Sequence, residues 1–363
     1  MNPTQQLHEL GQSLWLDNIT RPLIDSGALA RYITQYSITG LTSNPTIFEH
    51  AIGKSDAYDE AIARGSAKGQ TGEALFFDLA IADLRRAADL FRPTFDATDG
   101  MDGWVSLEVS PLLAHDAQGT VAAAKHLHQL ADRPNLFIKI PGTPEGVVAI
   151  EESIFAGAPV NVTLLFSAAQ YQASAEAYLR GIERRIAAGL DTKVRSVASL
   201  FVSRWDVAAN KTLPEPLHNR LGIAVAAQTY RAYRELLASS RWHRLAADGA
   251  QVQRLLWAST GTKDPAAPDT LYVEALAAPD TINTLPEKTL FALSDHGKVQ
   301  QHLRNDGGDA DATVTACREA GVDVDALAEQ LQREGAASFS QSWSKLLENL
   351  QAKAKPLGRT SQP

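Results

Sequence analysis

The sequence contains a single cysteine, Cys317, among its 363 residues. A lone cysteine cannot form a disulfide within the chain, so no disulfide framework holds this fold. No apolar run approaches the ~20 residues that a membrane-spanning helix needs. The opening residues, MNPTQQLHELGQ, have neither the basic nor the apolar stretch of a secretory signal peptide. We therefore expect a cytoplasmic protein that is not inserted in a membrane.

Common metal and nucleotide signatures are missing as well. The sequence has no HExxH, no cysteine cluster, no Walker A motif and no GxGxxG. His126 and His128 are two positions apart on a predicted helix and do not share a face. We therefore expect neither a metal nor a cofactor. A formal net charge of −8 argues against a nucleic-acid surface, and an anionic substrate would need a local basic pocket.

Short apolar segments alternate with longer helical segments along the chain. This alternation predicts parallel strands joined by crossover helices. We predict an α/β fold of the (β/α)8 TIM-barrel type with additional helices. It would form one domain over residues 1–355, followed by a flexible tail over 356–363. The predicted strands cover residues 13–18, 38–43, 102–109, 135–141, 159–166, 194–202, 251–258 and 280–285.

The last helix is predicted over residues 324–350, with Asp323 as its N-cap. Gly335 is expected to interrupt it. Its apolar stripe includes Phe339 and Trp343, which are candidates either for core packing or for a cover over a site.

Polar side chains interrupt the apolar strands, mostly near their ends. In FIKI, Phe137 and Lys139 share one face of the strand while the isoleucines share the other. Catalytic groups of α/β barrels lie at the C-terminal ends of the strands. We therefore expect one set of polar residues to converge on the barrel mouth: Asp17, Asn44, Glu108, Lys139, Asn161, Thr163, Ser199 and Ser259.

A lysine among apolar neighbours suits Schiff-base chemistry. Such surroundings disfavour the ammonium form, and a neutral amine can attack a ketone. The resulting iminium accepts electrons when a carbon–carbon bond breaks. A carboxyl group must then move protons, and Asp17 and Glu108 are the candidates beside Lys139.

Each candidate also has a purely structural interpretation, which the sequence leaves open. Lys139 would be a strand-end lysine that reaches water, and Glu108 a solvated loop carboxylate. Asn44 before Pro45 is typical of a helix N-cap, and Asp17 could cap a helix in competition with Thr20. The remaining structural interpretations are buried polar groups satisfied by the backbone for Asn161 and Thr163, and surface charges for Arg204 and Lys263.

Seven stretches together resemble the transaldolase family in its long bacterial form. They are SLWLDNITRPLI, ITGLTSNPTIFEHAI, VSLEVSPLLAHD, LFIKIPGTPEG, VNVTLLFS, VASLFVSRWD and NTLPEKTL. The resemblance spans nearly the whole chain. It implies a metal-free enzyme of the pentose phosphate pathway. Such an enzyme moves a dihydroxyacetone unit from sedoheptulose 7-phosphate or fructose 6-phosphate to an aldose phosphate.

The resemblance also implies a role for each matched residue. Lys139 would form the Schiff base, Asp17 would handle the proton of the breaking bond, and Glu108 would act with Thr163 and a water. The implied substrate contacts are Asn44 and Asn161 for the dihydroxyacetone hydroxyls, Ser199 and Phe201 for the pocket wall, and Arg204 for the phosphate.

One stretch departs from the family pattern. Short transaldolases carry a second phosphate-binding arginine after the seventh strand, where this chain reads WASTGTKDP. Ser259 and Lys263 are the candidates to replace it, and a lysine would act as a point charge. The alternatives are a fructose-6-phosphate aldolase-like enzyme and a non-catalytic sugar-phosphate binding protein. The partners expected are small sugar phosphates, with the chain a monomer or a homodimer.

Overall fold

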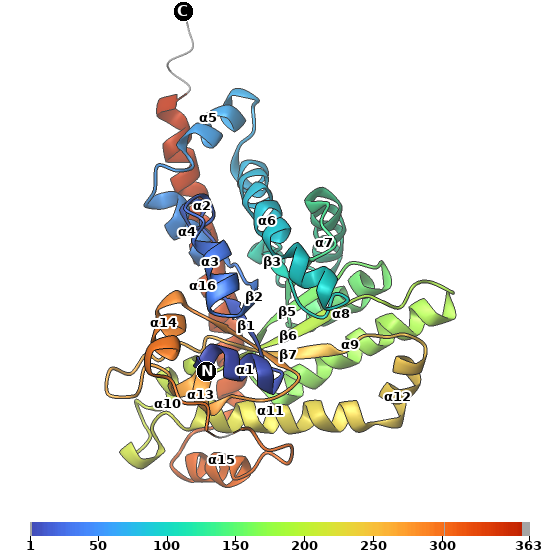
Figure 1. Cartoon of the computed structure of the whole chain (residues 1–363), viewed down its shortest axis with the longest axis vertical. Coiled ribbons are helices and arrows are strands. Elements are labelled where there is room, and N and C mark those ends of the chain that lie inside the picture. Colours follow the sequence, from blue (N-terminus) through green and yellow to red (C-terminus); the bar gives the residue numbers. More distant parts are fainter. Residues whose placement is uncertain (1, 301, 358–363) are drawn as a thin grey trace, which may run out of the picture.

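The computed structural model describes residues 2–300 and 302–357 (Figure 1). Within these residues, eight parallel strands form a nearly closed barrel in the order β2-β1-β8-β7-β6-β5-β4-β3. The predicted α/β barrel is therefore confirmed, and every predicted strand is present. The strands are β1 (Ser13–Leu16), β2 (Ile38–Leu41), β3 (Val105–Glu108), β4 (Leu136–Pro141), β5 (Val160–Leu165), β6 (Ser196–Phe201), β7 (Gln253–Ala258) and β8 (Thr281–Leu285).

The barrel closes where β2 meets the start of β3. A parallel bridge joins Gly40 to Trp104, and the Leu41 N–H donates to the Trp104 carbonyl at 2.9 Å. A Cβ at Gly40 would lie 2.7 Å from the Trp104 carbonyl oxygen and from the Trp15 ring. The glycine therefore permits the close approach that completes the barrel.

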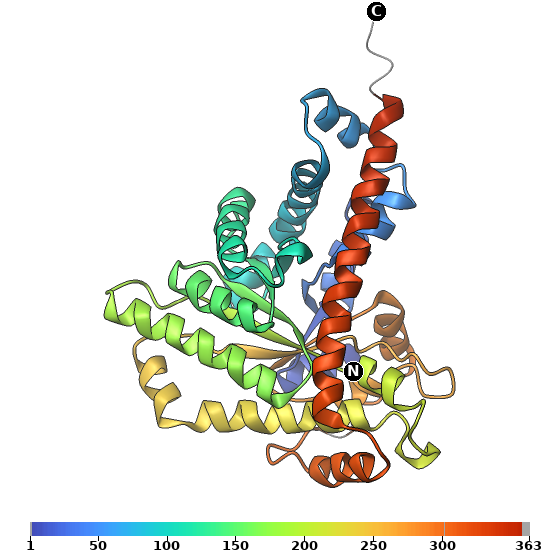
Figure 2. The ribbon, with the colours of Figure 1, turned by 180° about the vertical axis from the view of Figure 1, so that it is seen from behind.

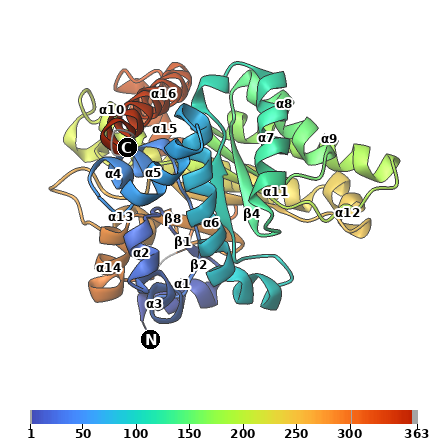
Figure 3. The same cartoon turned by 90° about the horizontal axis from the view of Figure 1, so that it is seen from above.

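Helices surround the barrel and extend beyond its mouth (Figures 1 and 3). In the part of the chain that the structure describes, no helix has both the length and the apolar character to cross a membrane. The first helices are α1 (Pro3–Leu10), α2 (Arg21–Asp25), α3 (Ala28–Gln35), α4 (Pro45–Gly53), α5 (Asp59–Ala67), α6 (Gly72–Ala97), η1 (Pro111–Leu113), α7 (Ala117–Ala131) and α8 (Pro144–Phe155). The later helices are α9 (Ala168–Ala187), α10 (Ser203–Ala209), η2 (Glu215–Leu217), α11 (Leu221–Ala238), α12 (Ser240–Ala247), α13 (Leu271–Ala275), α14 (Glu287–His296), α15 (Ala310–Glu319) and α16 (Val324–Leu357).

Alternation along the strands creates two apolar layers. Ile138 and Ile140 of β4 pack in the cluster between sheet and helices. Phe137 points into the barrel, where its ring stacks on Trp104 with 3.9 Å between centroids. Lys139 follows on the same inward face, so β4 directs this lysine to the barrel mouth.

The last helix differs from the prediction in two respects. It ends at Leu357, beyond the predicted end at residue 350 and over the first two residues of the predicted tail. Asp323 caps α16 as expected, because its carboxylate accepts from the Ala326 N–H at 3.0 Å. The expected interruption at Gly335 is wrong, since α16 runs unbroken past it. A Cβ at Gly335 would lie 2.8 Å from Leu164 Cδ2, so the glycine serves a close approach to β5 rather than a break. From residue 358 onward, the predicted tail lies outside the described residues.

Candidate active site

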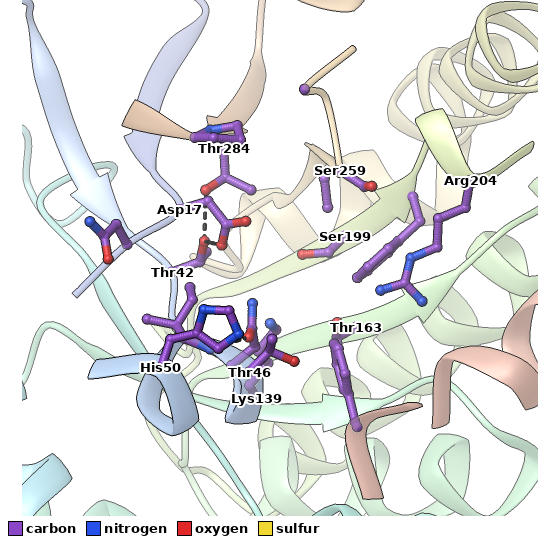
Figure 4. A pocket seen from close by; sticks show the side chains of 18 of the residues that line it. Asp17, Thr42, Thr46, His50, Lys139, Thr163, Ser199, Arg204, Ser259 and Thr284 are labelled. Atoms are coloured by element: carbon purple, nitrogen blue, oxygen red, sulfur yellow. Dashed lines mark hydrogen bonds between the residues drawn. The ribbon is translucent and has the colours of Figure 1, made fainter. Parts of the chain in front are cut away.

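A cavity of about 490 Å³ opens at the C-terminal ends of the strands (Figure 4). Glu108 and Asn161 do not line this cavity, but both are buried beside Lys139. The structure therefore brings the candidates together as the barrel prediction required. The predicted residues on the cavity wall are Asp17, Asn44, Lys139, Thr163, Ser199, Phe201, Arg204, Ser259 and Lys263.

Lys139 is buried, with 4% of its surface exposed. Its Nζ donates to the Ser43 carbonyl at 3.1 Å and lies 3.5 Å from Glu108 Oε2. Strand register fixes this arrangement, because Lys139 pairs with Glu108 on one side and with Asn161 on the other. The amine is held inside the mouth, so the interpretation of a surface-seeking strand-end lysine is wrong.

Glu108 is buried as well, which rules out a solvated loop carboxylate. Burial raises the pKa of Glu108 to about 7, although the nearby Lys139 and Arg204 cations lower it in part. Among the described residues, Glu108 Oε2 and Thr163 Oγ1 are buried oxygens without a hydrogen-bond partner. Buried polar atoms are rarely left unpaired, so these two oxygens are suited to bind a water or a substrate group.

Asp17 lies at the end of β1 and faces the cavity. The Thr42 hydroxyl donates to its carboxylate at 2.9 Å, and Thr42 in turn lies 2.7 Å from the Thr284 hydroxyl (Figure 4). Burial raises the pKa of Asp17, while Lys139 and the Thr42 hydrogen bond lower it in part. Thr20 caps α2 through the Leu23 N–H, so Asp17 does not serve as that cap.

Two asparagines were candidates for substrate contacts. Asn161 donates to the Ser106 hydroxyl at 3.0 Å and accepts from the Ser199 hydroxyl at 2.8 Å. These partners are side chains, so the expectation of backbone partners for Asn161 is wrong. Asn44 does cap α4, accepting from the Ile47 N–H at 3.0 Å, and it also faces the cavity.

A cationic side of the cavity faces Asp17 (Figure 4). Arg204 on α10 is partly buried, and its Cζ lies 4.8 Å from the centre of the Phe201 ring. Lys263 lies exposed at the rim of the cavity. Its exposure is compatible with the interpretation of this residue as a surface charge. The Ser259 hydroxyl lies 2.9 Å from that of Ser203. This side carries positive charge suitable for a substrate anion.

Sequence reasoning missed several wall residues. Thr42 and Thr284 carried a usable signal, because each ends an apolar strand as Asp17 does. His50 lies four residues after Thr46 on α4, so both side chains are on one face of the helix. The predicted helix start at Asn44 would have allowed this face to be found from the sequence. In the described part of the chain, no three His, Cys, Asp or Glu side chains are grouped to hold a metal.

The fold and its mouth define the broad class, an α/β barrel with a buried lysine and two carboxyl groups at the strand ends. The model of the family Transaldolase/Fructose-6-phosphate aldolase matches residues 14–350, and the chain belongs to this family.

Curated relatives agree with this assignment. A transaldolase from Frankia alni is 45% identical, with 99% of this chain and 98% of the relative covered. A transaldolase from Thiobacillus denitrificans is 46% identical, covering 96% of this chain and 99% of its own. One from Thermobifida fusca is 45% identical, with coverage of 96% and 97%. These likenesses support a transferase with transaldolase activity.

Proposed function

We propose that the chain is a transaldolase that transfers a dihydroxyacetone unit between sugar phosphates through a Schiff base on Lys139. The observation that carries this proposal is the buried Lys139 amine, held 3.5 Å from Glu108 in the wall of a cavity that Asp17 and Arg204 share. An amine in that place can attack the ketone of a substrate that enters from the mouth.

Glu108 and Thr163 serve the formation of the Schiff base. The Lys139 amine adds to the ketone carbon, and the carbinolamine loses its hydroxyl as water after a proton arrives. Glu108 Oε2 and Thr163 Oγ1, which have no hydrogen-bond partner among the described residues, can hold that water. Glu108 can give and take the proton, because burial raises its pKa to about 7.

Asp17 serves the cleavage of the carbon–carbon bond. Its carboxylate takes the proton from the hydroxyl next to the bond, the aldehyde leaves, and the electron pair moves into the iminium as an enamine. An acceptor aldehyde then reverses these steps, and Asp17 returns its proton to the new hydroxyl. Water finally releases the product from Lys139.

The other wall residues position the substrate in this proposal. Asn44 and Asn161 bind the dihydroxyacetone hydroxyls, with Ser199 and Phe201 forming the adjoining wall. Arg204 binds the substrate phosphate, and Ser259 and Lys263 assist it. The support for these roles is the shared cavity, together with the cationic side that faces Asp17. Asn161 does not line the cavity, and its support is its hydrogen bond with Ser199, which does.

The same proposal covers the setting of the enzyme. Residues 1–355 would act as one barrel domain. The protein would work in the cytoplasm as a monomer or homodimer. The donor would be sedoheptulose 7-phosphate or fructose 6-phosphate, as in the non-oxidative pentose phosphate pathway.

Dependence on the acceptor separates transfer from simple aldol cleavage. We would measure glyceraldehyde 3-phosphate released from fructose 6-phosphate, with and without erythrose 4-phosphate. A transaldolase should release at most about one equivalent per site without acceptor and turn over steadily with it. Fast, sustained cleavage without acceptor would instead indicate a fructose-6-phosphate aldolase. No release under either condition would indicate a binding protein.

A further inference from the structure

The Arg204 guanidinium lies close to two aromatic rings. Its Cζ is 4.8 Å from the ring centre of Phe201 and 5.8 Å from that of Phe339. Within the described residues, no side chain or carbonyl forms a hydrogen bond or salt bridge with this guanidinium. Its N–H donors are therefore available to a ligand, while the rings restrict where the group can lie.

Phe339 reaches this place from the far end of the chain. It lies on α16, is 4% exposed and forms part of the cavity wall. Its ring centre is also 5.8 Å from Lys139 Nζ, so one aromatic ring contacts both cations. The face of an aromatic ring attracts cations, and the attraction strengthens where water is excluded.

Specific contacts hold α16 against the barrel mouth. Gln332 Nε2 donates to the Gly142 carbonyl at 2.9 Å and to the Leu164 carbonyl at 3.0 Å, at the ends of β4 and β5. Seen from behind, α16 runs along most of the height of the molecule (Figure 2). The place of Phe339 is thus fixed by contacts outside the cavity.

Gly335 shows how closely the helix approaches Arg204. A Cβ there would lie 3.2 Å from Arg204 Nη1 and 2.8 Å from Leu164 Cδ2. The helix backbone therefore limits the guanidinium on one side, while Phe339, one turn later, faces it with a ring.

We propose that Phe339 is a positioning residue for Arg204, and that α16 thereby forms part of the phosphate-binding end of the site. This inference rests on the proposed function, in which Arg204 binds the substrate phosphate. Packed against Phe201 and Phe339, the guanidinium keeps its donors directed at the cavity. Less side-chain freedom is then lost when a phosphate binds.

The test compares phosphorylated and non-phosphorylated donors. Phe339→Leu keeps apolar volume but removes the ring face. We expect KM for fructose 6-phosphate to rise roughly tenfold, with KM for dihydroxyacetone changing less than about twofold. Phe339→Tyr, which retains a ring, should restore the native KM. Arg204→Ala should produce a larger change in the same direction.

Phe91→Leu provides the matched control, because Phe91 is fully buried in the cluster between sheet and helices. It loses the same ring and should leave both KM values unchanged. Should Phe339→Leu fail to fold, Gly335→Ala tests the other contact of α16 with Arg204, because the added Cβ would lie 3.2 Å from Arg204 Nη1, and it too should raise KM for fructose 6-phosphate alone.

Two outcomes would overturn the positioning role: no change in KM for either donor, or an equal rise for both. Borohydride trapping of fructose 6-phosphate on the native and variant proteins separates this failure from a failure of the proposed function. Adducts on both proteins with unchanged KM would reject only the role of Phe339. No adduct on the native protein would reject the proposed function itself.

Discussion

At the scale of single residues, Glu108 is a carboxyl group whose protonation changes near neutral pH. Burial raises its pKa to about 7, so the group is protonated below that pH and cannot accept a proton there. We expect kcat/KM to rise with pH through this value. Glu108→Gln should lower kcat/KM by roughly 100-fold and abolish this limb of the profile. A limb that persists unchanged in the variant would assign the titration to another group.

Thr42 contributes to the pKa of Asp17 through its hydroxyl. The hydrogen bond lowers the pKa of Asp17, against the larger effect of burial. Thr42→Val removes the donor, so the pKa of Asp17 should rise further. We expect kcat to fall roughly tenfold and its acid limb to move to higher pH. Thr42→Ser keeps the hydroxyl and should leave the limb in place, and a similar shift in both variants would contradict this role.

Sequence alone identified the chemical groups of the site better than their partners. Lys139 and Glu108 could be predicted because polar residues stand out within apolar strands. The contact between Thr42 and Thr284 joins hydroxyls 242 positions apart, and no local pattern records it. Such pairings arise from barrel closure, which sets the distances between strand ends.

At the scale of elements, the strands were predictable and the path of the last helix was not. The alternation of side chains along the sequence located β4 and its inward-facing lysine. One face of that strand packs against the helices and the other packs inside the barrel. The stripe on α16 correctly indicated burial of Phe339. It could not show that this ring packs on Arg204 and Lys139, since that depends on where a distant helix docks.

Gln332 is the residue through which the docking of α16 can be tested. Gln332→Ala leaves the Gly142 and Leu164 carbonyls without this donor. We expect the free energy of unfolding to fall by about 1–3 kcal/mol, measured by denaturant titration. Gln330 is exposed on the same helix and bonds only to Glu334 among the described residues. The free energy of unfolding of Gln330→Ala should therefore stay within about 0.5 kcal/mol of that of the native protein. Equal losses in the two variants would show that Gln332 does not hold α16 in place.

At the scale of the whole molecule, the two ends of the barrel use polar groups differently. At the N-terminal end, Asp102 accepts hydrogen bonds from Ser13 and Trp15, and Arg254 lies 3.9 Å from it. At the C-terminal end, Asp17 and Lys139 line the cavity. The Asp102 group thus pairs within the barrel, while the groups at the other end face the space where a substrate can bind, which assigns stability to one end and chemistry to the other.

Asp102→Asn tests that division. The change removes the charge beside Arg254, which is only 8% exposed. We expect a loss of about 3 kcal/mol in the free energy of unfolding, with kcat/KM of the folded enzyme within about twofold of native. A large loss of kcat/KM at unchanged stability would contradict the assignment.

Trapping the covalent intermediate tests the central claim most directly. The protein would be incubated with fructose 6-phosphate, reduced with borohydride, digested and analysed by peptide mass spectrometry. We expect a three-carbon adduct on Lys139, and none in Lys139→Ala, because the Lys139 amine lies in the cavity wall beside Glu108, where a substrate ketone can reach it. An adduct on another lysine, or no adduct on the folded native protein, would contradict the Schiff-base mechanism.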